Sequence, residues 1–321
     1  MTTAPIAAPR EPCRILSLDG GGAKGFYTLG VLAQVEALLN KQPLCNHFDL
    51  IFGTSTGAII AALLSLGYSV KNILSLYRQH VPVVMKHKTA SGRTKALDKL
   101  VLEVFGDADF SAVKTGVGIV ATHWDLQKPM IFKTSVAQAH GQEATFQPGF
   151  GCKLREAVRA SCSAFPFFKR FVLTTGQGLT VELFDGGYCA NNPTLYAVAD
   201  AVMAFKRQYA DIRVLSVGVG MYPEPKRWML RNVAERAVKT CIGFTALELF
   251  QKTLDVNTNS MEQLRAVLFK DIQAVRINDT FQQPEMATDL LEADLKKLEL
   301  LYLRGWESFA KHEKALKELL S

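Results

Sequence analysis

The fold is decided by the stretch Phe48-Asp49-Leu50-Ile51-Phe52-Gly53-Thr54-Ser55-Thr56-Gly57, an apolar run that ends in a turn of small residues. The strongly apolar segment 58–66 follows directly, so the order is that of a buried strand, a sharp turn and a helix. The same order occurs earlier, where the apolar run 14–18 leads into Asp19 and three glycines, and apolar residues then recur at helical spacing. Two strand-turn-helix units in succession predict an α/β sheet.

The rest of the chain continues this pattern. Strands are predicted over 117–122, 130–135, 181–184 and 214–219, the second as the hairpin partner of the first, and helices over 154–161 and 194–205, the latter opened by Pro193. The segment 86–99 is polar and basic with little periodicity, which indicates an exposed connection or a lid. Beyond Gly220 we find helical patterns and no convincing strand. We therefore expect a flexible tail over 1–13, an α/β domain over 14–220 and a helical cap over 221–321 packed on the same core.

Composition narrows the class of protein. A chain of 321 residues that is 48% hydrophobic can bury a full core, and its net charge of +7 favours anionic partners without choosing between phospholipid, nucleotide and nucleic acid. Six widely spaced cysteines without metal-site spacing predict free thiols in a reduced cytosolic chain, and no metal site. The segment 58–66 is far shorter than the ~20 residues that span a bilayer, and residues 1–11 lack an export signal. Any membrane contact should therefore be peripheral.

Ser55 is the candidate nucleophile. It is the serine of a G-x-S-x-G motif made with Gly53, Thr54, Thr56 and Gly57, and the strand before it and the helix after it are the context that the motif requires. A serine on such a turn has an exposed hydroxyl, and the N-terminal end of the following helix favours negative charge on a substrate oxygen. A small-residue turn that only connects strand to helix is the alternative.

Asp185 is the candidate base. It ends an apolar strand and is followed by Gly186 and Gly187, which places its carboxylate at the same edge of the sheet as Ser55. Because an aspartate with an ordinary pKa near ~3.9 is a weak base, it must lie within hydrogen-bond reach of the hydroxyl and be partly desolvated. A surface Asp-Gly-Gly turn is the alternative on this motif alone.

The histidines do not supply a Ser-His-Asp triad. Only His312 follows Asp185, and it lies in a charged terminal helix. The others have no evident partner in the sequence: they are His47, His80, His87, His123 and His140.

The glycine loop Gly20-Gly21-Gly22-Ala23-Lys24-Gly25 also fits G-x-G-x-x-G. A dinucleotide site would need an acidic residue at the end of the second strand, but Asp49 precedes that strand, and Asp19 would repel a pyrophosphate. Consecutive glycine N–H groups at a helix N-terminus suit an oxyanion instead. We predict an oxyanion hole formed by Gly20, Gly21, Gly22, Lys24 and Gly25, with Lys24 adding charge at its mouth or lying exposed.

The three blocks 19–25, 53–57 and 185–187, in this order and context, resemble the signature blocks of patatin-like phospholipases, and 160–166 resembles the small-residue stretch before that family's aspartate. The resemblance covers roughly 14–200. It implies a three-layer fold in which a sheet is flanked by helices, and a catalytic domain over 14–220. It also implies hydrolysis of phospholipid acyl esters by a Ser55–Asp185 dyad, without metal or cofactor. Phe165, Phe167 and Phe168 are candidates to line an acyl channel, with core packing as the alternative for at least one.

Within the family, the chain is similar to bacterial effectors of anti-phage (CBASS) systems that a cyclic nucleotide switches on to degrade the host membrane. This implies a cyclic dinucleotide or trinucleotide activator and a cytoplasmic protein that contacts the inner membrane peripherally when active. No nucleic acid partner is expected, and the resemblance is compatible with a homo-oligomer. Basic residues that could line a nucleotide pocket, with solvated side chains as the default, are Lys86, Lys88 and Arg93, or Lys226, Arg227 and Arg231.

The alternatives belong to other functional classes. One is a patatin-like module that binds lipid or nucleotide without turnover. Another is a constitutive housekeeping lipase or esterase. A third is a nucleotide-dependent oxidoreductase built on the glycine loop.

Overall fold

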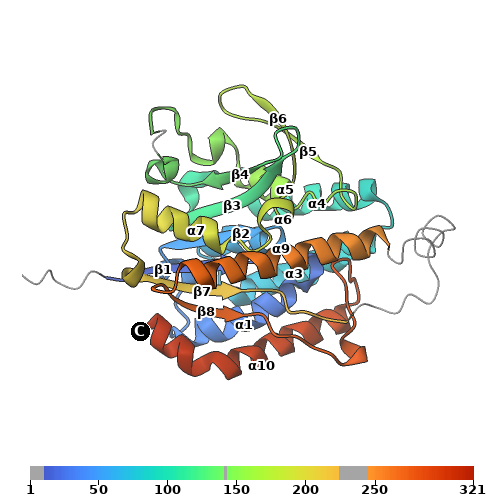
Figure 1. Cartoon of the computed structure of the whole chain (residues 1–321). Helices are drawn as coiled ribbons and strands as arrows, with labels where there is room; N and C mark the ends of the chain where they lie inside the picture. Colours follow the sequence, from blue (N-terminus) through green and yellow to red (C-terminus); the bar gives the residue numbers. More distant parts are fainter. Residues whose placement is uncertain (1–10, 141–142, 224–244) are drawn as a thin grey trace, which may run out of the picture.

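The computed structural model describes residues 11–140, 143–223 and 245–321. One mixed sheet runs through the described part, in the order β5-β6-β3-β2-β1-β7-β8, with β4 paired to β3 (Figure 1). Strands β3, β2, β1, β7 and β8 are parallel, whereas β4 and β6 run antiparallel to β3, and β5 antiparallel to β6. The strands are β1 (Cys13–Leu18), β2 (Leu50–Thr54), β3 (Gly116–His123), β4 (Lys128–Lys133), β5 (Phe171–Thr174), β6 (Thr180–Asp185), β7 (Ile212–Val217) and β8 (Gln273–Ile277).

Helices cover both faces of this sheet, which gives three layers. Ile15 of β1 packs in the apolar cluster that contains α7, while its neighbours Leu16 and Leu18 pack in the cluster that contains α1 and α10. Helices α1 and α10 lie side by side (Figure 1). Because both faces are buried, the central strands are continuous apolar runs rather than alternating ones. The helices are α1 (Gly25–Leu38), α2 (Thr56–Ser65), α3 (Val70–Lys86), α4 (Ala90–Phe105), α5 (Leu154–Ser161), α6 (Gly187–Ala190), α7 (Thr194–Ala199), α9 (Ala246–Leu268) and α10 (Leu295–Leu320).

Most predicted elements are confirmed with small shifts at their ends. The pair predicted over 117–122 and 130–135 is the hairpin β3–β4, and the helix over 154–161 is α5. The helix predicted over 194–205 begins after Pro193 as α7 and continues as a π-helical turn over Asp200–Ala204. Residues 1–10 of the predicted tail lie outside the described residues, and Cys13, which was assigned to the tail, opens β1.

The prediction of an exposed connection over 86–99 is wrong. Helix α4 begins at Ala90, and the Thr89 side chain caps it by accepting from the N–H of Gly92. The buried face of α4 carries Arg93 and Thr94 beside Leu97, and these polar residues interrupt the apolar period that identifies a helix.

The prediction that no strand follows Gly220 is also wrong. Strand β8 joins the sheet parallel to β7, with Leu215 opposite Val275. It is an edge strand that carries Gln273 and Arg276, so it lacks the apolar run of the central strands. The segment 221–321 therefore adds a strand as well as helices, and the division of the chain at 220 stays a prediction. Among the described helices, none is both long and apolar enough to cross a bilayer.

Candidate active site

Ser55 lies on a sharp turn between β2 and α2. Its backbone has φ 54° and ψ −120°, a conformation that costs a residue with a side chain on the order of 1–3 kcal/mol. A Cβ at Gly53 would lie 2.2 Å from the carbonyl oxygen of Gly57, and a Cβ at Gly57 would lie 2.3 Å from that of Leu18. Only glycines allow the backbone to approach this closely, so the small residues of the motif make the strained turn possible.

Hydrogen bonds that involve four hydroxyl groups hold the turn in place. The backbone N–H of Ser55 donates to Ser161 Oγ at 2.9 Å, and Ser161 Oγ donates to the carbonyl of Val120 at 2.5 Å. Thr54 Oγ1 donates to the carbonyl of Ala190 at 2.7 Å. Thr56 Oγ1 lies 2.8 Å from the hydroxyl of Tyr77. The elbow is therefore tied to β3, α3, α5 and α6.

Asp185 faces Ser55 directly. Ser55 Oγ donates to Asp185 Oδ2 at 2.8 Å, and the N–H of Gly187 donates to Oδ1 at 2.7 Å. The carboxylate is 2% exposed, and burial raises its pKa to about 7, while the bonds from Gly187 and Ser55 oppose that shift. A buried carboxylate with this pKa is a stronger base than an exposed one.

Asp185 lies at the site because of a strand direction that the sequence did not indicate. We expected its strand to end at the same edge as β2, but β6 is antiparallel to β3, with Ala121 opposite Asp185. Strand β3 extends three residues past Val120, which pairs with Thr54 at the end of β2. Strand β6 pairs with this extension, so its last residue arrives beside the serine turn. A Cβ at Gly186 would lie 2.1 Å from the carbonyl of Val120, which explains the glycine after the aspartate.

The glycine loop packs against the serine turn. A Cβ at Gly20 would lie 3.2 Å from the Ser55 Cβ. The N–H of Gly20 donates to the carbonyl of Asn191, and that of Ala23 donates to the carbonyl of Leu290, both at 3.0 Å. Gly21 and Gly22 line a cavity together with Ser55 and Asp185, and no acceptor for their N–H groups is found among the described residues. These two glycines are the members of the predicted oxyanion region that line the cavity.

Lys24 and Gly25 do not face this cavity. Lys24 is 3% exposed, so the expectation that it lies exposed or at the mouth is wrong. Burial lowers its pKa, and Asp255 and Asp289 oppose that shift. A Cβ at Gly25 would lie 2.5 Å from Thr56 Oγ1, so Gly25 allows the loop to pack on the serine turn.

The cavity beyond the Ser55–Asp185 pair is apolar. Phe168 lines it, Phe167 packs on the ring of Phe250, and Phe165 is 39% exposed. Of the three aromatic candidates for an acyl channel, Phe168 therefore faces the cavity. The apolar lining comes from α2, α3, α4, α9 and connecting segments: Ile59, Val81, Val84, Met85, Leu97, Leu100, Cys162, Ala164, Phe168, Phe250, Leu254 and Leu290.

The sequence pattern of the family described as patatin-like phospholipase matches residues 16–198, more than half of the chain. The chain belongs to the patatin-like phospholipase family. This confirms the predicted family, the α/β fold and the lipid ester hydrolase class. The matched region contains Ser55, Asp185 and the glycine loop.

Relatives of this patatin-like phospholipase include proteins named for nucleotide activation. It is 58% identical over 308 residues to a cUMP-AMP-activated phospholipase of Escherichia coli, which covers 96% of this chain and 94% of the relative. It is 28% identical over 238 residues to a cGAMP-activated phospholipase of Vibrio cholerae, covering 65% and 64% of the two chains. The crystal structure of VipD from Legionella pneumophila is similar with a TM-score of 0.48 and 13% identity, over 97% of this chain and 68% of VipD.

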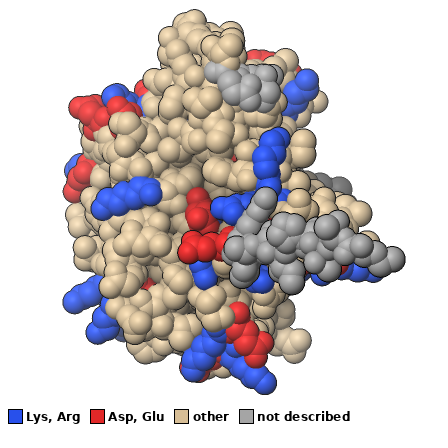
Figure 2. All heavy atoms as spheres, turned by 90° about the vertical axis from the view of Figure 1, so that its left-hand side faces the viewer, with Lys and Arg blue, Asp and Glu red and all other residues tan. Residues whose placement is uncertain are grey.

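The basic residues proposed for a nucleotide pocket differ in their exposure and in whether the structure describes them. Arg93 is 6% exposed and donates to the carbonyls of Phe167 and His87, so it belongs to the scaffold, and its proposed place in a nucleotide pocket is wrong. Lys86 and Lys88 are exposed, whereas the candidates in 226–231 lie outside the described residues. On the face seen in Figure 2, the described Lys and Arg side chains are scattered among acidic and neutral residues rather than gathered in one patch.

Sequence reasoning missed several residues around this site. Ser161, Asn191 and the α9 residues Phe250 and Leu254 contact or line it. The asparagine pair at 191–192, so close to the aspartate motif, was a signal that could have been noticed. Helix α9 gave none, because its contribution depends on contacts with residues far away in the sequence.

Three of the described histidines have partners outside the candidate site. His140 Nε2 lies 2.6 Å from Asp200 Oδ1, His47 Nε2 lies 3.1 Å from the carbonyl of Leu320, and His312 Nε2 lies 3.9 Å from Asp279 Oδ1.

Proposed function

We propose that this protein hydrolyses acyl esters of membrane phospholipids, with Ser55 as nucleophile and Asp185 as its base. The observation that carries the proposal is the 2.8 Å hydrogen bond from Ser55 Oγ to Asp185 Oδ2, two residues that line an apolar cavity. Membership of the patatin-like phospholipase family supports the same reaction.

The reaction would proceed in two steps. Ser55 Oγ attacks the ester carbonyl carbon while Asp185 takes the hydroxyl proton, and the carbonyl oxygen becomes an oxyanion. The N–H groups of Gly21 and Gly22, near the N-terminal end of α1, stabilise that charge. Asp185 then returns the proton to the leaving alkoxide, which departs as an alcohol and leaves an acyl-serine. In the second step Asp185 takes a proton from water, the hydroxide attacks the acyl-serine, and the proton goes back to Ser55 as the fatty acid leaves.

The apolar cavity would hold the acyl chain. Burial of each methylene group of a lipid tail contributes about 0.8 kcal/mol, so a lining of aliphatic and aromatic side chains favours long acyl chains. The carbonyl at the head of such a chain would lie where Ser55 and the Gly21 and Gly22 amides meet.

We also propose that a cyclic dinucleotide activates the enzyme and that its role is antiviral, through damage to the host membrane. The name of the Escherichia coli relative, and its 58% identity across 96% of this chain, support a ligand like cUMP-AMP. A phospholipid substrate requires contact with a membrane surface, and we propose peripheral contact with the inner membrane from the cytoplasm.

One experiment separates the proposal from its alternatives. Fatty acid release from vesicles of phosphatidylethanolamine and phosphatidylglycerol is measured for the wild type and Ser55→Ala, with and without cUMP-AMP. We expect release by the wild type that rises with cUMP-AMP and is lost in Ser55→Ala. Equal release with and without the nucleotide would indicate a constitutive lipase, and no release under either condition would favour a binding module without turnover.

A further inference from the structure

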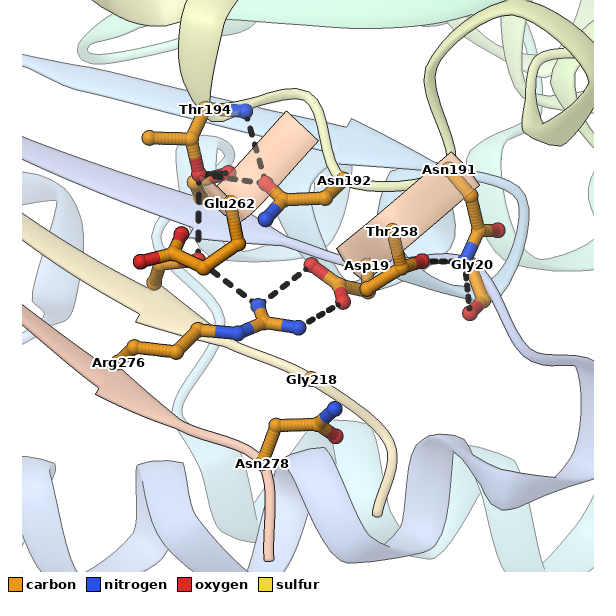
Figure 3. Close-up of polar contacts among 12 residues, drawn as sticks. Asp19, Gly20, Asn191, Asn192, Thr194, Gly218, Thr258, Glu262, Arg276 and Asn278 are labelled. Atoms are coloured by element: carbon orange, nitrogen blue, oxygen red, sulfur yellow. Dashed lines mark hydrogen bonds and ion pairs between the residues drawn. The ribbon is translucent and has the colours of Figure 1, made fainter. Parts of the chain in front are cut away.

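Arg276 of β8 is bonded to the residue that opens the glycine loop. Its Nη1 donates to Asp19 Oδ1 at 2.9 Å and its Nη2 donates to Asp19 Oδ2 at 2.5 Å, an arrangement with two parallel bonds (Figure 3). The two residues are 257 positions apart in the chain. Asp19 is 1% exposed and directly precedes Gly20. A guanidinium fork bonded to both oxygens of a carboxylate fixes its orientation as well as its position.

The same guanidinium reaches the segment that follows Asp185. Arg276 Nη1 also donates to Ser216 Oγ at 2.8 Å, and Thr194 Oγ1 lies 3.1 Å from that oxygen. Thr194 Oγ1 in turn lies 2.5 Å from Asn192 Oδ1. One side chain from the edge strand is therefore connected to both halves of the candidate site.

Asn191 holds the glycine loop from the other side. Its carbonyl accepts from the N–H of Gly20 at 3.0 Å, and its Nδ2 lies 3.3 Å from the carbonyl of Gly20. Nδ2 also donates to Thr258 Oγ1 of α9 at 2.7 Å. With Asp19 and Gly20 fixed in this way, the position of the next two amides, those of Gly21 and Gly22, is set by their chain neighbours.

The charge of Asp19 makes this arrangement depend on Arg276. Burial raises the pKa of Asp19, and the guanidinium opposes that shift. Removing one partner of a buried ion pair leaves an uncompensated charge, which the surrounding structure relieves by moving or by admitting water. Arg276 lies beyond residues 16–198, the part of the chain that matches the family.

We propose that Arg276 is a positioning residue, which sets the Gly21 and Gly22 amides for the oxyanion through its bonds to Asp19. The inference rests on the proposed hydrolysis by Ser55 and Asp185. Because the oxyanion exists only after attack, a displaced loop weakens binding of the transition state more than binding of the ester. Loss of Arg276 should therefore lower kcat and leave KM nearly unchanged.

Arg276→Lys tests this with a variant that keeps the charge of the pair. A lysine ammonium cannot make the two parallel bonds to Asp19 and the bond to Ser216 together. On para-nitrophenyl butyrate with cUMP-AMP present, we expect kcat to fall about tenfold, KM to stay within about twofold and Tm to stay within a few degrees. The matched control is Arg213→Lys on β7, whose guanidinium bonds to the carbonyls of Ala210 and Ile212 at the other end of the strand, and which should have wild-type kcat.

A second pair of variants tests the role of charge. Arg276→Gln leaves Asp19 buried without a cation, and we expect kcat to fall about a hundredfold. The double variant Asp19→Asn, Arg276→Gln replaces the ion pair by two amides and should recover at least about tenfold of the loss. If Arg276→Gln does not fold, the kinetics of Arg276→Lys test the inference.

A kcat of Arg276→Lys within about twofold of the wild type would overturn the inference. So would a rise in KM with unchanged kcat, or an equal loss in Arg213→Lys. Failure of the proposed hydrolysis would look different, because Ser55→Ala in the same assay would then retain wild-type turnover.

Discussion

Ser55 and Asp185 are 130 positions apart in the chain, and the hydroxyl of the first donates to the carboxylate of the second at 2.8 Å. The contact forms because β6 runs antiparallel along the extended end of β3 and stops beside the turn after β2. The proposed nucleophile and its proposed base are thus joined without an imidazole between them. The pKa of Asp185, raised by burial, makes this pair sensitive to pH near neutrality.

Activity should increase with pH through about pH 7. Burial raises the pKa of Asp185 to about 7, so the carboxylate is mostly protonated below that pH and cannot accept the Ser55 proton. We expect kcat/KM on para-nitrophenyl butyrate to rise about tenfold per pH unit below about pH 6.5 and to level off above about pH 8. A profile that is flat from about pH 5 to about pH 9 would contradict this role for Asp185.

Titration of Asp185 should change stability in the direction opposite to activity. The folded-state pKa of Asp185 lies above the unfolded value, so the folded protein binds more protons between about pH 4 and about pH 7. Stability from this group is therefore fully present below the unfolded pKa and is lost as pH rises to about 7. We expect the free energy of unfolding of the wild type, relative to Asp185→Asn, to fall across this window in urea titrations. A constant difference would show that the pKa is not raised.

Ser161→Ala should loosen the serine turn. The variant removes the acceptor for the Ser55 N–H, and we expect a loss of about 1–3 kcal/mol in the free energy of unfolding and about tenfold in kcat. Ser65→Ala is the matched control, because Ser65 is equally buried and its Oγ bonds to the carbonyl of Ala61 within α2. The control should keep wild-type kcat, and a similar loss of kcat in both variants would count against a specific effect on the turn.

Thr258→Val should weaken the link between α9 and the glycine loop. Valine keeps the shape of threonine but removes the oxygen that accepts from Asn191 Nδ2. We expect kcat to fall about fivefold with little change in KM. Thr253→Val, an exposed position of the same helix whose hydroxyl bonds to the carbonyl of Leu249, should be neutral. The measurement is steady-state kinetics of both variants at equal folded fraction. An unchanged kcat in Thr258→Val would show that the bond from α9 to Asn191 does not affect turnover.

Met85→Trp should shorten the acyl chains that the enzyme accepts. Met85 of α3 lines the apolar cavity, and an indole there occupies space that a long chain would need. We expect kcat/KM for a palmitoyl ester to fall at least about tenfold, while that for a butyryl ester stays within about twofold. Val83→Trp is the control, since Val83 lies on the same helix and is 55% exposed. Equal loss for both esters would show that the substitution damages the fold rather than the chain site.

The local motifs could be predicted from the sequence, because their conformations depend on residues close together in the chain. Gly53 is required by a contact within the turn, with the carbonyl of Gly57, and the three glycines after Asp19 are consecutive. Asp185 was predicted to lie beside Ser55, and it does, although β6 runs antiparallel to β3. A strand pattern indicates where a strand ends and not whether it is parallel to its neighbours.

The long-range contacts could not be predicted in this way. Strand β8 is stabilised by pairing with β7 about sixty positions earlier, and its own residues include Gln273 and Arg276. The bond between Arg276 and Asp19 has no local signal, since either residue alone is typical of a solvated surface. The buried Arg93 was mistaken for a surface residue for the same reason. It donates to the backbone carbonyls of Phe167 and His87, and because every residue has a backbone carbonyl, the sequence does not reveal such partners.

The most direct test of the Ser55–Asp185 pair is the rate at which a fluorophosphonate modifies the intact protein, located by peptide mass spectrometry. We expect the wild type to carry the adduct on Ser55, Ser55→Ala to carry none, and Asp185→Asn to react at least about a hundredfold more slowly while keeping its Tm. Modification of Asp185→Asn at the wild-type rate, or an adduct on another residue that persists in Ser55→Ala, would contradict the account.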